Sequence, residues 1–174
     1  MGTEKYNDWD LLAIAQHHGL ATRLLDWTYN PLVAAFFAVE KYINTEAVIY
    51  AYLDPKHLIT DSIGPFDNYH TIGKFKPNGA SKRIIRQSGI FTVHFPATLE
   101  LDKDKGKNCK LEKIIIDKKY RKELLFDLSF YGINKASMFP DLEGLCKHVN
   151  WHMENINYWT SKQIENFVAA DSEN

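Results

Sequence analysis

The feature that most constrains the fold is a segment that is apolar on nearly every side. Residues 31–42 read PLVAAFFAVEKY. Pro31 suits the first position of a helix, where its missing N–H is not needed, and Thr28 or Asn30 can cap that helix. Because a helix that is apolar all round must be buried, we expect it to lie centrally in the core. There it would hold the preceding loop, residues 20–30, in a fixed geometry.

Helices and strands are expected in the order helices, strands, helices. The pattern predicts a first helix capped by Asn7 or Asp8 that runs to His18 and ends at Gly19. Strands are expected where β-branched and aromatic residues cluster, at Ala47–Asp54, Ile90–Phe95 and Leu111–Asp117. A helix should follow from Asp117 to Tyr131, and a last amphipathic helix should carry the apolar stripe made by Leu142, Leu145, Cys146, Val149 and Met153.

The remaining segments are expected to be irregular. Residues 55–78 contain Gly and Pro without a clear period and predict a loop or lid. One helical turn should start at Ser81 and break at Ser88-Gly89, and LDKDKGKNCK reads as a surface link. We therefore predict a single α+β domain over residues 1–170, with a small mixed or antiparallel sheet flanked by helices, and a frayed tail over residues 171–174.

Composition and charge exclude several classes of protein. The 174 residues hold 21 basic and 22 acidic side chains, so the net charge of −1 provides no general attraction for nucleic acid or anionic lipid. A nucleic-acid-acting protein would need a local patch such as Lys118–Lys122, which otherwise reads as a solvated helix face. The sequence has no apolar run long enough to span a membrane. Two cysteines without metal-ligand spacing predict a reducing, cytoplasmic location.

Polar side chains are concentrated just before the apolar helix. His17 and His18 are adjacent on a helix and point about 100° apart, so we predict no metal site there. Arg23 and Asp26 could brace the loop as an ion pair. Alternatively, Arg23 or the free amides before Pro31 could face a phosphate. Trp27 could belong to the core or serve as a stacking platform.

A second polar cluster precedes the strand Ile90–Phe95. It contains Ser81, Arg83, Gln87, Gly89 and Phe91. Gln87 is placed to project from the mouth of a strand into a cleft, where an uncharged amide would orient a reactant rather than abstract a proton. The alternative is that Gln87 caps a turn. Glycine-rich nucleotide loops and the hydrolase nucleophile elbow are absent from the sequence.

The motifs together resemble a known family. The run Ala15–Val39, AQHHGLATRLLDWTYNPLVAAFFAV, strongly resembles the signature of FRG domains from bacteria and phages, with His18 in place of the usual aromatic residue and Ala21 in place of the usual Pro. Two later segments, Arg83–Phe91 and Tyr131–Leu145, also look like this family. The Phe-Arg-Gly tripeptide that names the family is missing, so the chain is expected to be either a trimmed domain or a degenerate member.

The resemblance implies a function. FRG domains look similar in layout to ADP-ribosyltransferases, which implies an NAD-dependent transferase or NAD glycohydrolase that serves in phage defence or as a toxin. NAD or a related nucleotide would be the substrate, with an unknown protein or nucleic-acid acceptor. The implied catalytic residues are Gln87, Arg23 and His18. The implied NAD-contacting residues are His17, Gly19, Thr22, Asp26, Trp27, Thr28, Arg83 and Phe91. Two alternatives stay open, a catalytically silent binding module of the same fold and a nucleic-acid-acting protein.

Overall fold

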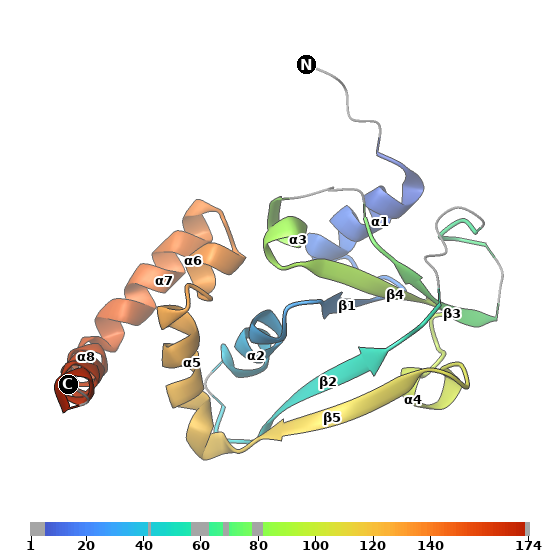
Figure 1. Cartoon of the computed structure of the whole chain (residues 1–174). Helices are drawn as coiled ribbons and strands as arrows, with labels where there is room; N and C mark the ends of the chain where they lie inside the picture. Colours follow the sequence, from blue (N-terminus) through green and yellow to red (C-terminus); the bar gives the residue numbers. More distant parts are fainter. Residues whose placement is uncertain (1–5, 42, 57–62, 68–69, 78–81, 173–174) are drawn as a thin grey trace.

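The computed structural model describes residues 6–41, 43–56, 63–67, 70–77 and 82–172. Its elements follow one another along the chain (Figure 1) as α1 Asp8–His17, β1 Leu24–Thr28, α2 Pro31–Val39, β2 Ala47–Leu53, β3 Thr71–Phe75, α3 Lys82–Arg86, β4 Gly89–Phe95, α4 Leu101–Asp104, β5 Lys110–Ile116, the 3-10 turn η1 Lys118–Tyr120, α5 Arg121–Phe130, α6 Lys135–Met138, α7 Leu142–Glu154 and α8 Ile156–Ser172. The α+β class expected from the sequence is confirmed.

A three-stranded antiparallel sheet carries one face of the core. Its strand order is β1-β4-β3, with Asp26 opposite Phe91 and Thr28 opposite Gly89. Alternate side chains of a strand point to one face, and here that face packs against α1. The resulting cluster of buried residues contains Trp9, Leu12, Ala13, Leu24, Phe75, Ile84, Phe91, Val93 and Phe95. This cluster fixes β1 relative to α1 and α3.

A separate two-stranded antiparallel sheet, β2-β5, supports the second half of the molecule. Isolated two-stranded ribbons are marginally stable, so this sheet needs the helices α2 and α5 beside it. The second buried cluster comes from these elements and from α6: Val33, Ala35, Phe36, Val39, Ala47, Leu128 and Met138. The antiparallel sheet structure is confirmed, but it is divided into two sheets rather than being one.

The apolar helix forms as expected and is less enclosed than expected. Pro31 starts α2, and the Asn30 side chain accepts a hydrogen bond from the Leu32 amide. α2 packs against α5, β2 and β1. Leu32 and Phe37 nevertheless remain 43% and 38% exposed. Phe37 is exposed because it faces a cavity. Tyr42, the predicted end of this helix, lies outside the described residues.

Three predicted irregular segments contain regular structure. β1 lies within the predicted loop 20–30, β3 lies within 55–78, and α4 lies within the charged link. β1 and β3 are strands because each pairs with β4, one on either side of it. The predicted helical turn is α3, although its expected start at Ser81 lies outside the described residues. Gly19 ends the first helix with φ +91°, as predicted.

The carboxy-terminal helices α6–α8 form an arm beside α5, on the opposite side of the molecule from β3 and α4 (Figure 1). The predicted last helix is α7, but its apolar stripe is not buried: Leu142, Leu145, Val149 and Met153 are 48–75% exposed. The buried residue of α7 is instead Gly144, which packs closely against Phe139. A Cβ added to Gly144 would lie 2.1 Å from the Phe139 carbonyl oxygen. α8 was not predicted. It includes the first two residues of the predicted frayed tail, and residues 173–174 lie outside the described residues.

The basic run Lys118–Lys122 contains a structural arginine. Arg121 is 5% exposed and donates hydrogen bonds to the carbonyls of Thr45, Lys41 and Ala38, at 2.9, 2.7 and 3.3 Å. Two of these carbonyls lie at the end of α2, where helix carbonyls lack partners within the helix. Arg121 therefore ties α5 to α2 and is unavailable to a nucleic-acid phosphate.

Candidate functional site

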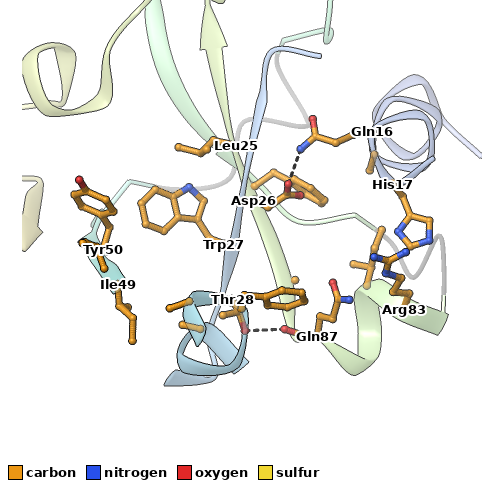
Figure 2. A pocket seen from close by; sticks show the side chains of 18 residues that line it. Gln16, His17, Leu25, Asp26, Trp27, Thr28, Ile49, Tyr50, Arg83 and Gln87 are labelled. Atoms are coloured by element: carbon orange, nitrogen blue, oxygen red, sulfur yellow. Dashed lines mark hydrogen bonds between the residues drawn. The ribbon is translucent and has the colours of Figure 1, made fainter. Parts of the chain in front are cut away.

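A cavity of about 550 Å³ lies among α1, α2, α3, β1 and β2 (Figure 2). This volume is within the range of small-molecule sites. Most of the predicted site residues line it: His17, Asp26, Trp27, Thr28, Arg83, Gln87 and Phe91. The structure thus brings the two polar clusters of the sequence together, on either side of one space.

Four predicted site residues do not line the cavity. His18 and Gly19 are exposed at the end of α1, and Thr22 and Arg23 lie in the approach to β1. The guanidinium of Arg23 lies over the ring of Phe95, with its carbon 5.3 Å from the ring centre. The amino end of α2 is also outside the lining, so a phosphate bound by its amides, as predicted, would lie outside this cavity.

β1 presents its residues to two sides of the cavity. Figure 2 shows Leu25 and Trp27 directed toward Tyr50, and Asp26 directed oppositely toward Gln16 and α1. This follows from the alternation of side chains along a strand. One wall of the cavity is therefore apolar and aromatic, and the other is polar.

Asp26 is held by α1 rather than by Arg23. Its Oδ2 accepts a hydrogen bond of 2.9 Å from Gln16 Nε2, and the Gln16 side-chain oxygen in turn accepts from the Thr22 hydroxyl. The predicted ion pair with Arg23 is not formed, because an extended chain separates residues three apart by roughly 10 Å. Gln16 was not predicted as a site residue, although it is the second residue of the FRG-like run Ala15–Val39.

The Trp27 side chain is held by one hydrogen bond and one ring contact. Its Nε1 donates to the Thr92 hydroxyl at 3.1 Å, and its ring lies 5.5 Å from that of Tyr52. The Thr92 hydroxyl also contacts His94 Nε2, whose other nitrogen contacts the Leu99 carbonyl. This chain of contacts fixes the Trp27 ring, which is half-buried and lines the cavity. It can act as a platform while belonging partly to the core.

Gln87 links three elements. Its main-chain carbonyl accepts a hydrogen bond of 2.7 Å from the Thr28 hydroxyl, and its Nε2 donates to the Met138 carbonyl at 3.0 Å. Within the described part of the chain its side-chain oxygen has no hydrogen-bond donor. The amide is therefore held in one orientation, with an acceptor oxygen left for a ligand.

Arg83 lies in the cavity wall without a close carboxylate. The ring of Phe139 supports its guanidinium at 4.1 Å, and its buried Nε has no hydrogen-bond partner among the described residues. Burial lowers the pKa of Arg83, while the more distant carboxylates Asp141, Glu40 and Asp26 act in the opposite direction. A guanidinium remains charged under these conditions and can bind an anion.

His17 lies near Arg83 on the polar wall (Figure 2). Burial lowers the pKa of His17 first, and the positive charges of Arg83 and His18 lower it further. His17 is therefore predominantly neutral at pH 7 and can accept a proton. Among the described residues, no group of three or more His, Cys, Asp or Glu is arranged to hold a metal ion.

Sequence reasoning missed the apolar wall of the cavity. It contains Leu25, Ala34, Phe37, Ala38, Val48, Ile49 and Tyr50. These residues lie on strands and a helix that were expected to be buried. That they line a cavity could be recognised only once the two sheets were known to be separate. No helix in the part of the chain that the structure describes is both long and apolar enough to cross a membrane.

Comparison with known proteins found a match in the amino-terminal segment. Residues 1–47 match the family described as FRG domain, which confirms the resemblance over α1, β1 and α2. This match includes Gln16, His17, Asp26, Trp27 and Thr28, whereas Arg83 and Gln87 lie beyond it. No curated protein and no solved structure matched the chain.

Proposed function

We propose that this chain, whose residues 1–47 are those of an FRG domain, binds NAD or a related nucleotide in the cavity and cleaves the bond between nicotinamide and ribose. The observation that carries the proposal is the position of Arg83. It is a partly buried guanidinium with a free buried Nε, beside a histidine and across a cavity from an aromatic wall. Such a site suits a ligand that has both anionic and aromatic groups.

Arg83 would bind the diphosphate. The aromatic ring of Phe139 lies behind its guanidinium and restricts its position, so little ordering remains to be done when an anion binds. An arginine can donate two parallel hydrogen bonds to a phosphate, and these are stronger than neutral ones. This role was assigned to Arg23 from the sequence, but Arg83 is the arginine that lines the cavity.

Trp27 and Tyr50 would hold the rings of the ligand. Both line the apolar wall, and Trp27 is fixed by its bond to Thr92. Stacking of a base on an aromatic side chain contributes about 1–3 kcal/mol. A nucleotide would therefore lie with its rings toward β2 and its phosphates toward α3.

The bond cleavage requires an acceptor and a site for developing positive charge. The electron pair of the ribose–nitrogen bond leaves with nicotinamide, and positive charge develops on the ribose. The Asp26 carboxylate, oriented by Gln16, would stabilise that charge. The oxygen of Gln87 would orient the attacking water or acceptor hydroxyl, and neutral His17 would take its proton. With water the products are nicotinamide, ADP-ribose and a proton.

The proposal is tested by release of nicotinamide from NAD. The purified chain should release nicotinamide, and Gln87→Ala should lower the rate by about 100-fold, as is typical when an orienting group is lost. Gln87→Glu serves as a second variant, since it restores an acceptor at the same place. Ser88→Ala changes a neighbouring residue outside the cavity lining and should leave the rate unchanged. Equal rates in Gln87→Ala and the unaltered chain would contradict the assignment.

A binding module without turnover is the second candidate. It is favoured by the engagement of Gln87, whose amide nitrogen is already bonded to the Met138 carbonyl. Lacking a negative charge, Gln87 would contribute less to catalysis than a glutamate would. NAD binding without nicotinamide release would select this candidate. Action on nucleic acid, phage defence and toxicity stay predictions, and the burial of Arg121 weakens the first of them.

A further inference from the structure

The outer edge of β1 is open to the cavity. In the sheet order β1-β4-β3, β1 is the terminal strand and pairs with β4 alone among the described strands. The main-chain bonds at both ends of the pairing use odd-numbered residues: His94 donates to the Arg23 carbonyl, and Tyr29 donates to the Ser88 carbonyl. Since bonding alternates along an antiparallel strand, the N–H and C=O groups of Asp26 and Thr28 point away from β4.

The cavity lining shows that this edge faces the cavity. Four consecutive residues of β1, Leu25 to Thr28, line it. Successive side chains point to opposite faces of a sheet, so a surface that contacts four in a row must lie along the strand edge. In Figure 2, the Trp27 and Asp26 side chains lie on opposite sides of β1, and β4 lies behind β1.

The two walls of the cavity beside the β1 edge differ in chemistry. Leu25, Phe37 and Tyr50 are 45%, 38% and 52% exposed on one side, and together they contribute to an apolar wall of the cavity. On the other side lie Asp26, His17 and Arg83. An added strand would place its alternate side chains on these two walls.

We propose that the β1 edge binds an extended segment of a separate polypeptide, with apolar side chains at alternate positions and hydrogen-bonding side chains between them. The segment would add as a fourth strand to the three-stranded sheet, and the Asp26 and Thr28 main-chain groups would pair with it. Donors and acceptors repeating every two residues along β1, roughly 7 Å apart, match the spacing of another strand. The proposal does not depend on nucleotide binding, because main-chain groups carry it.

The outer edge of β5 is less suitable than that of β1. β5, at the far edge of the two-stranded sheet, carries Lys110, Glu112 and Lys113, and charged side chains on an edge oppose strand addition. Asp26 is the single charge within β1, and Gln16 holds its side chain toward α1 and away from the edge. Of these two edges, that of β1 is therefore better suited to strand addition.

The test uses the full chain and a displayed library of random heptapeptides, without nucleotide. Enriched peptides should alternate in polarity as described. In such a peptide, methylating the main-chain nitrogen of every second residue should weaken binding at least about tenfold, while methylation of the intervening residues should change it less than about threefold. No enrichment over a support without protein, or loss that does not alternate, would overturn the proposal.

A pair of variants at one residue tests the edge itself. Proline is tolerated where the N–H of an edge strand faces away from its sheet. Asp26→Ala removes the carboxylate from the polar wall but keeps the outward N–H, and Asp26→Pro removes both, so Asp26→Pro should bind the peptide at least about tenfold more weakly than Asp26→Ala. Equal binding by both variants would overturn the proposal. If Asp26→Pro does not fold, the methylation scan on the unaltered chain decides.

Discussion

The Thr28 hydroxyl donates a hydrogen bond of 2.7 Å to the main-chain carbonyl of Gln87, 59 residues further along the chain. The same hydroxyl accepts from the Asn30 amide at 3.0 Å, so it also shapes the turn into α2. Two polar clusters that are distant in sequence are joined at this point. The bond holds β1 to the turn between α3 and β4, on one side of the cavity.

Replacing the Thr28 hydroxyl should loosen this junction. Thr28→Val keeps the shape but leaves the Gln87 carbonyl and the Asn30 amide without their partner, which should lower the free energy of unfolding by about 1–3 kcal/mol. Thr28→Ser keeps the hydroxyl and should cost less than Thr28→Val. Urea unfolding of the three proteins measures the difference. Equal stability of the valine and serine variants would show that the hydrogen bonds contribute nothing.

Arg121 should be a stability residue rather than a nucleic-acid contact. Arg121→Met leaves three carbonyls without their donor and should lower the free energy of unfolding by about 3–5 kcal/mol. The exposed Lys118 belongs to the same basic run, and Lys118→Met should change stability by less than about 0.5 kcal/mol. Thermal unfolding distinguishes the two, and similar melting temperatures would contradict the structural role.

His17 should make the protein less stable in mild acid. Its folded pKa is lowered by burial and by Arg83, while in the unfolded chain it titrates near 6.5. Between these two pKa values the unfolded state binds more protons, so the free energy of unfolding falls as the pH drops through about 6.5 and levels off below the folded pKa. Solvent screening keeps this effect under about 1 kcal/mol.

His17→Gln removes the titrating group, so comparing this variant with the unaltered chain isolates the effect of His17. Stability measured by urea unfolding at pH 7.5 and pH 5.5 should fall less in the variant than in the unaltered chain. A larger fall in the variant would mean that the folded state binds the proton more tightly than the unfolded state, opposite to the expected sign.

The exposed stripe of α7 should tolerate polar residues. Leu145→Gln, Val149→Gln and Met153→Gln together should change the free energy of unfolding by less than about 1 kcal/mol, since these side chains are already about half exposed or more. Phe126→Ala is the contrast: Phe126 is 1% exposed and contacts the rings of Trp151, Tyr158 and Trp159. Its loss should cost about 3–5 kcal/mol by chemical denaturation. Similar costs for both would contradict the observed orientation of α7.

The starts of α1 and α2 and the strands β2, β4 and β5 could be predicted from the sequence because local chemistry determines them. Asn7 caps α1 with a capping box, and Asn30 with Pro31 starts α2. β2 and β5 consist of β-branched and aromatic runs. In each case the signal lies within a few residues of the element it specifies.

Elements that depend on distant partners could not be predicted. β1 reads LLDWT with a single buried residue, so it shows no simple alternation, and it is a strand because β4 pairs with it. The stripe on α7 has the right period for a buried face, yet the close approach of Gly144 to Phe139 selects the other face. Period alone does not say which side of a helix meets the core.

The site was predicted in part for the same reason. The family motif placed His17, Asp26, Trp27 and Thr28, and the spacing to the strand placed Gln87 and Arg83, all of which line the cavity. Arg23 and Asp26 were read as neighbours in a loop, whereas the extended β1 separates them. Gln16 could be recognised only once α1 was known to lie beside β1.

Binding of NAD, measured by titration calorimetry, tests the central claim that Arg83 forms an anion site in this cavity. Arg83 and Arg86 lie on the same short helix, but Arg86 is exposed and outside the cavity lining. Arg83→Ala should weaken NAD binding by about 10- to 100-fold, as expected when a charged hydrogen bond to phosphate is lost, while Arg86→Ala should bind like the unaltered chain. Equal affinity in all three proteins, or no NAD binding by the unaltered chain, would contradict the account.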